Sequence, residues 1–194
     1  MSPPFIRHRW QLRCFTEVGQ DAFLSGLVGS HSGNMSLRDG LRVVITRHGA
    51  RLGRLSRAGL VAFRLDSGGI PIGASSEAAL HAAVYMRTSK LAVFHAHPAH
   101  AIALSLRDGA PEVFPATLEA AHYLPRVPVV DAPAGPAVAA SAEELAGLLS
   151  EFRLIVSRGH GTYAAGASLE EALQWTSVFE EACKAMLALR GRGR

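Results

Sequence analysis

Short segments rich in β-branched apolar residues alternate along the chain with longer segments whose apolar residues recur at helical spacing. The first kind predicts strands and the second predicts helices. We expect strands at 41–46, 60–65, 91–97, 127–130, 154–156 and 162–165, and helices at 10–28, 78–86, 99–106, 142–149 and 168–189. The polar, glycine-containing segment 29–38 is expected to be a loop. This alternation predicts an α/β fold, a single three-layer α/β/α domain over residues 1–194 with a mostly antiparallel or mixed central sheet.

Composition favours a globular protein and excludes several other classes. Hydrophobic residues make up 48% of the chain and charged residues 19%, which is typical of a packed core. No apolar run approaches the roughly 18 residues that a membrane helix needs, and no apolar segment follows the basic N-terminus, so neither a membrane span nor a signal peptide is expected. Cys14 and Cys183 have no CxxC partner. We interpret them as reduced thiols of a cytoplasmic protein.

The basic residues indicate an anionic small molecule more than nucleic acid. The formal net charge is +4, which is compatible with either kind of ligand. The basic residues are scattered, however, and are not interleaved with aromatic residues as in a surface on which bases stack. We therefore expect no nucleic-acid partner and a weak field that attracts phosphate.

The segment FHAHP, residues 94–98, is the strongest local signal for chemistry. Residues two apart in a strand face the same side, so His95 and His97 would present two imidazoles together. Pro98 would end the strand and leave both side chains at its open end. Imidazoles are common zinc ligands, although two histidines in a strand are also compatible with an ordinary exposed surface.

A catalytic metal site of this kind needs a third protein ligand. His160 is one candidate, because it follows a predicted strand and lies between two glycines that allow close backbone approach. His100 is a rival candidate, on the helix that follows the two histidines. His81, within the predicted helix 78–86, is expected to be structural.

Small polar residues flank the start of the predicted helix 78–86. Glu77 follows Ser75 and Ser76, and it is either a capping carboxylate or an acid–base group facing the metal. The two serines and the segment 33–36 are compatible with routine loops. They are also compatible with an anion site built from hydroxyls, backbone amides and a helix N-terminus.

Together these segments resemble the class II aldolase/adducin family, typified by fuculose-phosphate aldolase. The matching blocks, in order, are SGNMSLR at 32–38, ITRHG at 45–49, SSE at 75–77 followed by LH at 80–81, VFHAHP at 93–98, RGHG at 158–161, and LEEA at 169–172. The resemblance covers roughly residues 10 to 187. An ordered set of blocks is more specific than any one of them.

The resemblance implies the roles of individual residues. His95, His97 and His160 would bind Zn²⁺, or another divalent metal, and Glu77 would be the general acid/base and contact the resting metal. Asn34, Gly49, Ser75 and Ser76 would hold the substrate phosphate.

The implied activity is that of a zinc-dependent aldolase, a carbon–carbon lyase. It would cleave a small ketose phosphate, such as fuculose phosphate, through a metal-stabilised enediolate to dihydroxyacetone phosphate and an aldehyde. The family also implies a homo-oligomer, expected to be a tetramer. Composition and charge, as above, predict no nucleic-acid or membrane partner.

The departures from the family pattern leave other activities open. His48 replaces a threonine before Gly49, Arg158 replaces an asparagine before the third histidine, and Glu119 and Tyr123 lie near the position of a proton-donating tyrosine. The alternative reactions are those of a sugar-phosphate epimerase, a methylthioribulose-phosphate dehydratase and a decarboxylase. A non-catalytic, adducin-like binding module is the alternative of a different class.

Overall fold

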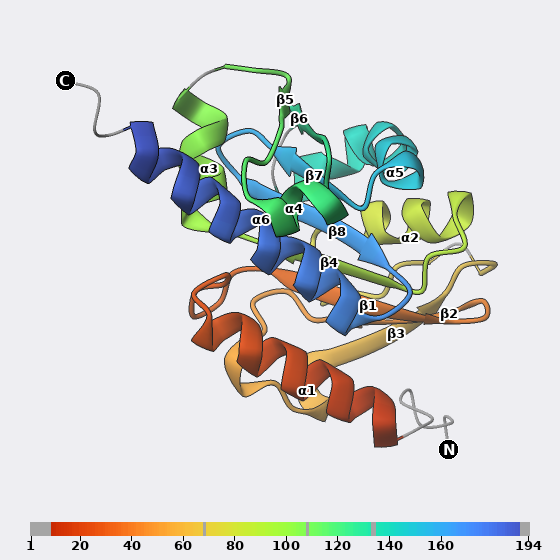
Figure 1. Cartoon of the computed structure of the whole chain (residues 1–194). Helices are drawn as coiled ribbons and strands as arrows, with labels where there is room; N and C mark the ends of the chain where they lie inside the picture. Colours follow the sequence, from red (N-terminus) through yellow and green to blue (C-terminus); the bar gives the residue numbers. More distant parts are fainter. Residues whose placement is uncertain (1–8, 68, 108, 133–134, 191–194) are drawn as a thin grey trace.

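The computed structural model describes residues 9–67, 69–107, 109–132 and 135–190 and places six helices and eight strands among them. The helices are α1 (Arg9–Leu24), α2 (Ala78–Arg87), α3 (Ala99–Arg107), α4 (Leu118–Tyr123), α5 (Ala142–Glu151) and α6 (Leu169–Arg190). The strands are β1 (Asn34–Asp39), β2 (Arg42–Thr46), β3 (Leu60–Arg64), β4 (Ala92–Ala96), β5 (Glu112–Val113), β6 (Val127–Val130), β7 (Leu154–Ser157) and β8 (Gly161–Gly166). Figure 1 labels these elements along the chain.

The strands form one sheet in the order β3-β2-β1-β4-β8-β7-β6-β5. Every described pair of neighbouring strands is antiparallel except β6 and β7, which run parallel. The predicted α/β class, with its mostly antiparallel or mixed sheet, is confirmed. That the whole chain from 1 to 194 forms a single domain stays a prediction. No helix among the described residues is long and apolar enough to cross a bilayer.

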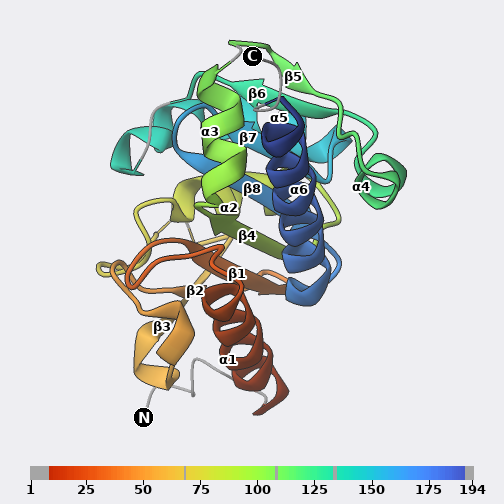
Figure 2. The same ribbon diagram turned by 60° about the vertical axis from the view of Figure 1, so that its left-hand side comes forward.

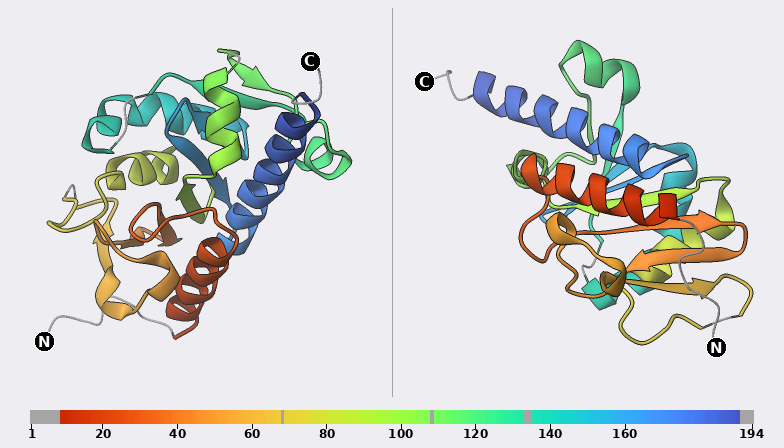
Figure 3. Two further views of the ribbon diagram at one scale, coloured as in Figure 1. Left: turned by 90° about the vertical axis from the view of Figure 1, so that its left-hand side faces the viewer. Right: turned by 90° about the horizontal axis from the view of Figure 1, so that it is seen from below.

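Alternation along the strands divides the apolar residues between two cores, one on each face of the sheet. Phe94 of β4 packs into a core with residues of α1, α3 and α6, whereas Val93 packs into a core with residues of α2 and α5. Figure 2 shows α3 and α6 in front of the sheet, and the left panel of Figure 3 shows the sheet between the two helical layers. The expected three layers are present.

The expectation that 29–38 is a loop was wrong for its second half, which forms the central strand β1. Its polar residues hide the strand pattern because they are buried with partners of their own. Asn34 hydrogen-bonds to Glu77, and Ser36 lies 2.7 Å from Nδ1 of His81. Buried polar groups are tolerated where they are hydrogen-bonded. β1 therefore places the polar side chains of Asn34 and Ser36 on the buried face of the sheet that α2 covers.

The first helix is also shorter than expected, and two short elements had no predicted counterpart. α1 ends at Leu24 and not at 28, and the apolar residues Leu27 and Val28, which suggested continuation, are buried in the segment after it. β5 and α4 lie in a stretch without a clear apolar period. Elsewhere the expected strands and helices lie within a few residues of the observed ones.

The N-terminus of α3 is capped by a side chain from α6. The Glu180 carboxylate accepts hydrogen bonds from the backbone N–H groups of His100 (3.0 Å) and Ala101 (2.9 Å), and from Nδ1 of His100 (2.7 Å). These backbone groups are among the donors that a helix start leaves without partners, and a carboxylate there also complements the helix dipole. Glu180 thereby fixes α3 directly after His97.

Replacing Glu180 by alanine should lower the free energy of unfolding by about 1–2 kcal/mol, the usual effect of losing a helix cap. Glu181, the next residue, is exposed, so Glu181→Ala is a matched control that should change stability by less than about 0.5 kcal/mol. Urea unfolding followed by circular dichroism measures both. Equal effects of the two substitutions would show that Glu180 does not act as a cap.

Candidate metal centre and active site

Three side chains form a row across the middle of the sheet. Asn34 of β1 is the cross-strand partner of His95 of β4, and His95 is the partner of Tyr163 of β8. Directly opposed residues point to the same face of a sheet. Here that face is the one covered by α2, and the ring of Tyr163 stacks on the imidazole of His95 with centroids 4.3 Å apart and 17° between the planes.

Glu77 lies above this row, immediately before α2. The residue is 2% exposed. Asn34 Nδ2 donates to Oε2 of the carboxylate (2.8 Å), and the Tyr163 hydroxyl donates to Oε1 (2.8 Å). Oε2 is also 3.6 Å from Nε2 of His95. The alternative interpretation of Glu77 as a capping carboxylate is wrong, because its side chain makes no capping hydrogen bond.

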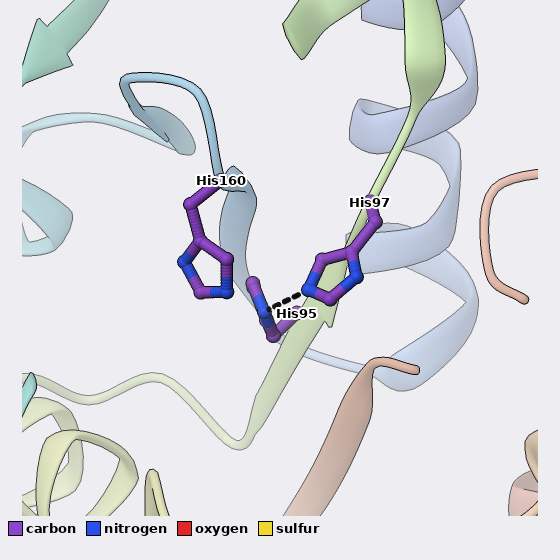
Figure 4. Close-up of side chains that lie close together, drawn as sticks. All are labelled: His95, His97 and His160. Atoms are coloured by element: carbon purple, nitrogen blue, oxygen red, sulfur yellow. Dashed lines mark hydrogen bonds between the residues drawn. The ribbon is translucent and has the colours of Figure 1, made fainter. Parts of the chain in front are cut away.

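The three predicted histidine ligands converge at one point. His95 lies in β4, His97 follows the end of that strand, and His160 lies in the turn between β7 and β8. One ring nitrogen from each lies within 4.8 Å of the others, and Nε2 of His97 is 2.8 Å from Nε2 of His95. Figure 4 shows the three rings turned toward one another.

A glycine brings the third histidine to the other two. A Cβ at Gly161 would collide with the carbonyl oxygen of Ala96 and lie 2.9 Å from Cδ2 of His97. Only glycine therefore lets the start of β8 approach the end of β4 so closely. The pairing that results places His160, the preceding residue, beside His97, with ring centroids 4.9 Å apart.

The electrostatics keep these imidazoles neutral. Burial lowers the pKa of His95 well below its usual range, and the neighbouring His97 and His160 lower it further. Burial likewise lowers the pKa of His97 and of His160. Neutral imidazole is the form that binds a metal, so these three histidines are able to bind one at neutral pH.

The hydrogen bonds around the histidines also fit a metal ion. Nδ1 of His95 donates to the carbonyl oxygen of Thr162 (2.9 Å), which leaves the lone pair on Nε2 facing His97. Backbone acceptors of this kind fix the ring orientation of metal-binding histidines. Three neutral imidazoles beside an open cavity match the ligand set of a catalytic divalent metal, so the residues present fit such an ion.

A cavity of about 340 Å³ opens on the histidines and Glu77. All four residues expected to hold phosphate line it: Asn34, Gly49, Ser75 and Ser76. Ser75 and Ser76 lie ahead of α2, so the positive end of that helix faces the same region. The structure therefore brings every predicted site residue to one cavity.

The cavity rim also carries basic side chains from two further loops: His31, Arg47 and His48. Glu77 is the one carboxylate among its lining residues. Sequence reasoning singled out His48 as a departure but missed His31 and Tyr163. The signal for Tyr163 was its position three residues after His160 in a predicted strand, which places it opposite His95 once the two strands pair.

Other candidates lie outside the cavity. His100 is bound to Glu180, which excludes it as a ligand in this arrangement. His81 is fully buried, and burial lowers its pKa to about 3, as expected of a structural residue. Glu119 faces a separate hollow of about 630 Å³ between α1 and α6, and Tyr123 packs against Trp175 with centroids 5.3 Å apart.

Arg158, the departure beside His160, has a structural role. Its Nε donates to Asp131 (2.7 Å), and the other guanidinium nitrogens donate to the carbonyl oxygens of Ser105 (2.6 Å) and Ala110 (3.0 Å). It therefore ties the His160 turn to the end of α3 and does not line the cavity.

Comparison with known proteins places this arrangement among enzymes. L-fuculose phosphate aldolase of Methanococcus maripaludis is 31% identical over 157 residues, with 80% of this chain and 83% of the relative covered. Methylthioribulose-1-phosphate dehydratase of Acidiphilium cryptum is 32% identical over 168 residues, covering 79% of this chain and 78% of the relative. The crystal structure of L-fuculose-1-phosphate aldolase from Thermus thermophilus superposes with a TM-score of 0.87 at 36% identity, over 94% of this chain and 97% of that one.

The family model for the class II aldolase and adducin N-terminal domain matches residues 14–187. That range contains the whole row Asn34–His95–Tyr163, Glu77 and the three histidines. The chain belongs to the family of class II aldolases and adducins.

Proposed function

We propose that the chain is a metal-dependent lyase that cleaves a small ketose phosphate, such as fuculose phosphate, to dihydroxyacetone phosphate and an aldehyde. The observation that carries the proposal is the buried Glu77 carboxylate, held 3.6 Å from Nε2 of His95 at the edge of a polar cavity. Metal-assisted cleavage of this kind needs a group that transfers a proton and a set of neutral side chains that can bind the metal, and both are present here.

In this proposal His95, His97 and His160 hold a divalent metal, with zinc as the first choice. A bound ion would supply Lewis-acid stabilisation of negative charge on the substrate carbonyl oxygen. Glu77 moves the proton, and Oε2 is the atom nearest the imidazoles. The hydrogen bonds from Asn34 and Tyr163 leave further lone pairs on the carboxylate, so it can accept a proton in place.

The opposite side of the cavity is suited to phosphate. Ser75 and Ser76 supply hydroxyls at the start of α2, and Gly49 supplies backbone without a side chain. Asn34 also lines this side, although one of its N–H groups is taken by Glu77. Arg47 adds a positive charge to this side of the cavity. A phosphorylated substrate would therefore bind with its anionic end here and its reactive carbons near Glu77.

A dehydratase acting on methylthioribulose phosphate is the second candidate, supported by the 32% identity to such an enzyme. It needs the same proton transfer beside a carbonyl group. Epimerase and decarboxylase chemistry remain further alternatives, and a non-catalytic binding module is the alternative without chemistry. The homotetramer and the cytoplasmic location stay predictions.

The test is metal analysis of the purified protein together with a product assay on ketose 1-phosphates and methylthioribulose 1-phosphate. We expect stoichiometric zinc or another divalent metal, and dihydroxyacetone phosphate from one ketose phosphate. The variant His97→Ala should lose the metal and remain folded, whereas His122→Ala, an exposed histidine on α4, should keep it. Dehydration without cleavage would replace the aldolase proposal by the second candidate, and protein that binds no metal would contradict both.

Glu77→Gln should keep the metal and lower kcat by about 100-fold or more, since general acid–base catalysis contributes that much. The amide retains the size and hydrogen-bonding capacity of the side chain but cannot take a proton. Metal analysis and steady-state kinetics on the same sample separate the two effects. Turnover at the wild-type rate would remove Glu77 from the mechanism.

Arg47→Met should raise KM for a phosphorylated substrate by about 10- to 100-fold and leave kcat nearly unchanged. The variant loses a charge-assisted contact to phosphate worth roughly 1.5–3 kcal/mol. Arg51→Met is the matched control, because Arg51 is exposed, four residues away, and does not line the cavity. An equal change in both variants would indicate a general field effect and not a contact.

A further inference from the structure

Tyr163 contacts both Glu77, the proposed acid–base group, and His95, a proposed metal ligand. Tyr163 itself does not line the cavity. Its side chain is fully buried. The hydroxyl donates to Oε1 of Glu77 at 2.8 Å, and the ring stacks on His95 at 4.3 Å between centroids. No other described residue makes both contacts.

We infer that Tyr163 is a positioning residue for the metal centre: its hydroxyl orients the Glu77 carboxylate and its ring fixes the His95 imidazole. The inference rests on the proposed function, and it concerns a residue that acts through two others. The two contacts use different parts of one side chain, so the roles can be separated by substitution.

The hydroxyl contact is more than a way to satisfy a buried polar group. A carboxylate can only accept hydrogen bonds, so the Tyr163 hydroxyl is the donor in this contact. Asn34 donates to the other oxygen. One donor on each oxygen defines the rotation of the carboxylate plane, and this rotation decides which lone pair faces the reacting atoms.

The ring contact follows from strand pairing. His95 and Tyr163 are direct partners in the β4–β8 ladder, so the stacked ring occupies one face of the imidazole. The Nδ1 bond to the carbonyl of Thr162 holds the edge of the same imidazole. Together the two contacts fix the direction in which Nε2 points. This lowers the conformational entropy that the side chain loses when a metal binds.

Two substitutions separate the contacts. Tyr163→Phe keeps the ring and removes the hydroxyl; we expect metal affinity within about threefold of wild type, and kcat lowered by about 10- to 100-fold with KM nearly unchanged. Tyr163→Leu removes the ring as well; we expect it also to weaken metal binding by about 10- to 100-fold, as losses around a metal ligand do. Metal affinity is measured without substrate, by competition with a chromogenic chelator.

Tyr85→Phe is the matched control. Tyr85 is equally buried, and its hydroxyl donates to the carbonyl oxygen of Ser36 at 3.0 Å, but it does not line the cavity. Its loss should lower the melting temperature without changing metal affinity or the ratio of kcat to KM. A kinetic change of similar size in Tyr85→Phe would mean that any lost buried hydroxyl has this effect, and it would overturn the inference.

A crystal structure of metal-loaded Tyr163→Phe provides a readout that needs no substrate. The Glu77 carboxylate should leave its wild-type orientation while the three histidines stay in place. An unmoved carboxylate, or wild-type metal affinity in Tyr163→Leu, would overturn the positioning role. Failure of the proposed function is distinguishable, because the wild-type protein would then bind no metal or release no dihydroxyacetone phosphate.

Discussion

The buried carboxylate of Glu77 is the constraint on which the centre of the structure depends. A charged group withdrawn from water is strongly unfavourable unless hydrogen bonds replace its hydration. Here the two donors come from β1 and β8, the strands on either side of β4. The carboxylate therefore favours the order β1-β4-β8 and the placement of α2 directly above it, and the same order carries His95 to the cavity.

The three histidines depend on a second set of contacts, around the end of β4. Gly161 allows β8 to begin against the carbonyl of Ala96, and the carbonyl of Thr162 takes the Nδ1 proton of His95. On the other side of the strand end, Glu180 holds the start of α3. Each contact is backbone geometry or a cap, so the ends of the regular elements set the positions of the ligands.

Much of the site was predictable because local patterns carried it. His95 and His97 are two residues apart before a proline, which indicates the end of a strand, and their side chains do meet. The choice of His160 over His100 needed more than spacing, since both lie within a few residues of the end of a predicted strand. The structure separates them by a contact distant in sequence, the pairing of His100 with Glu180. Such contacts leave no trace in a local pattern.

The parts that sequence reasoning missed share one physical cause. β1 looked like a loop because Asn34 and Ser36 are polar, and Tyr163 looked like an ordinary strand residue. Both become intelligible once buried partners from α2 and its N-terminus are known. A polar side chain in a strand is read as exposed when its partner is more than forty residues away. Basic residues such as His31 were likewise assigned to the cavity only by the path of the chain.

The row formed by Asn34, His95 and Tyr163 makes the site sensitive to strand alignment. Sliding β4 by one residue would put Phe94 in place of His95 and turn the imidazole toward α6. The contributing positions are separated by more than sixty residues along the chain, so the site cannot assemble before distant parts of the sheet have paired. Metal binding would thus indicate that these strands have paired in the correct register. An ion bound there would link β4 to the start of β8, two neighbouring strands that no short turn connects.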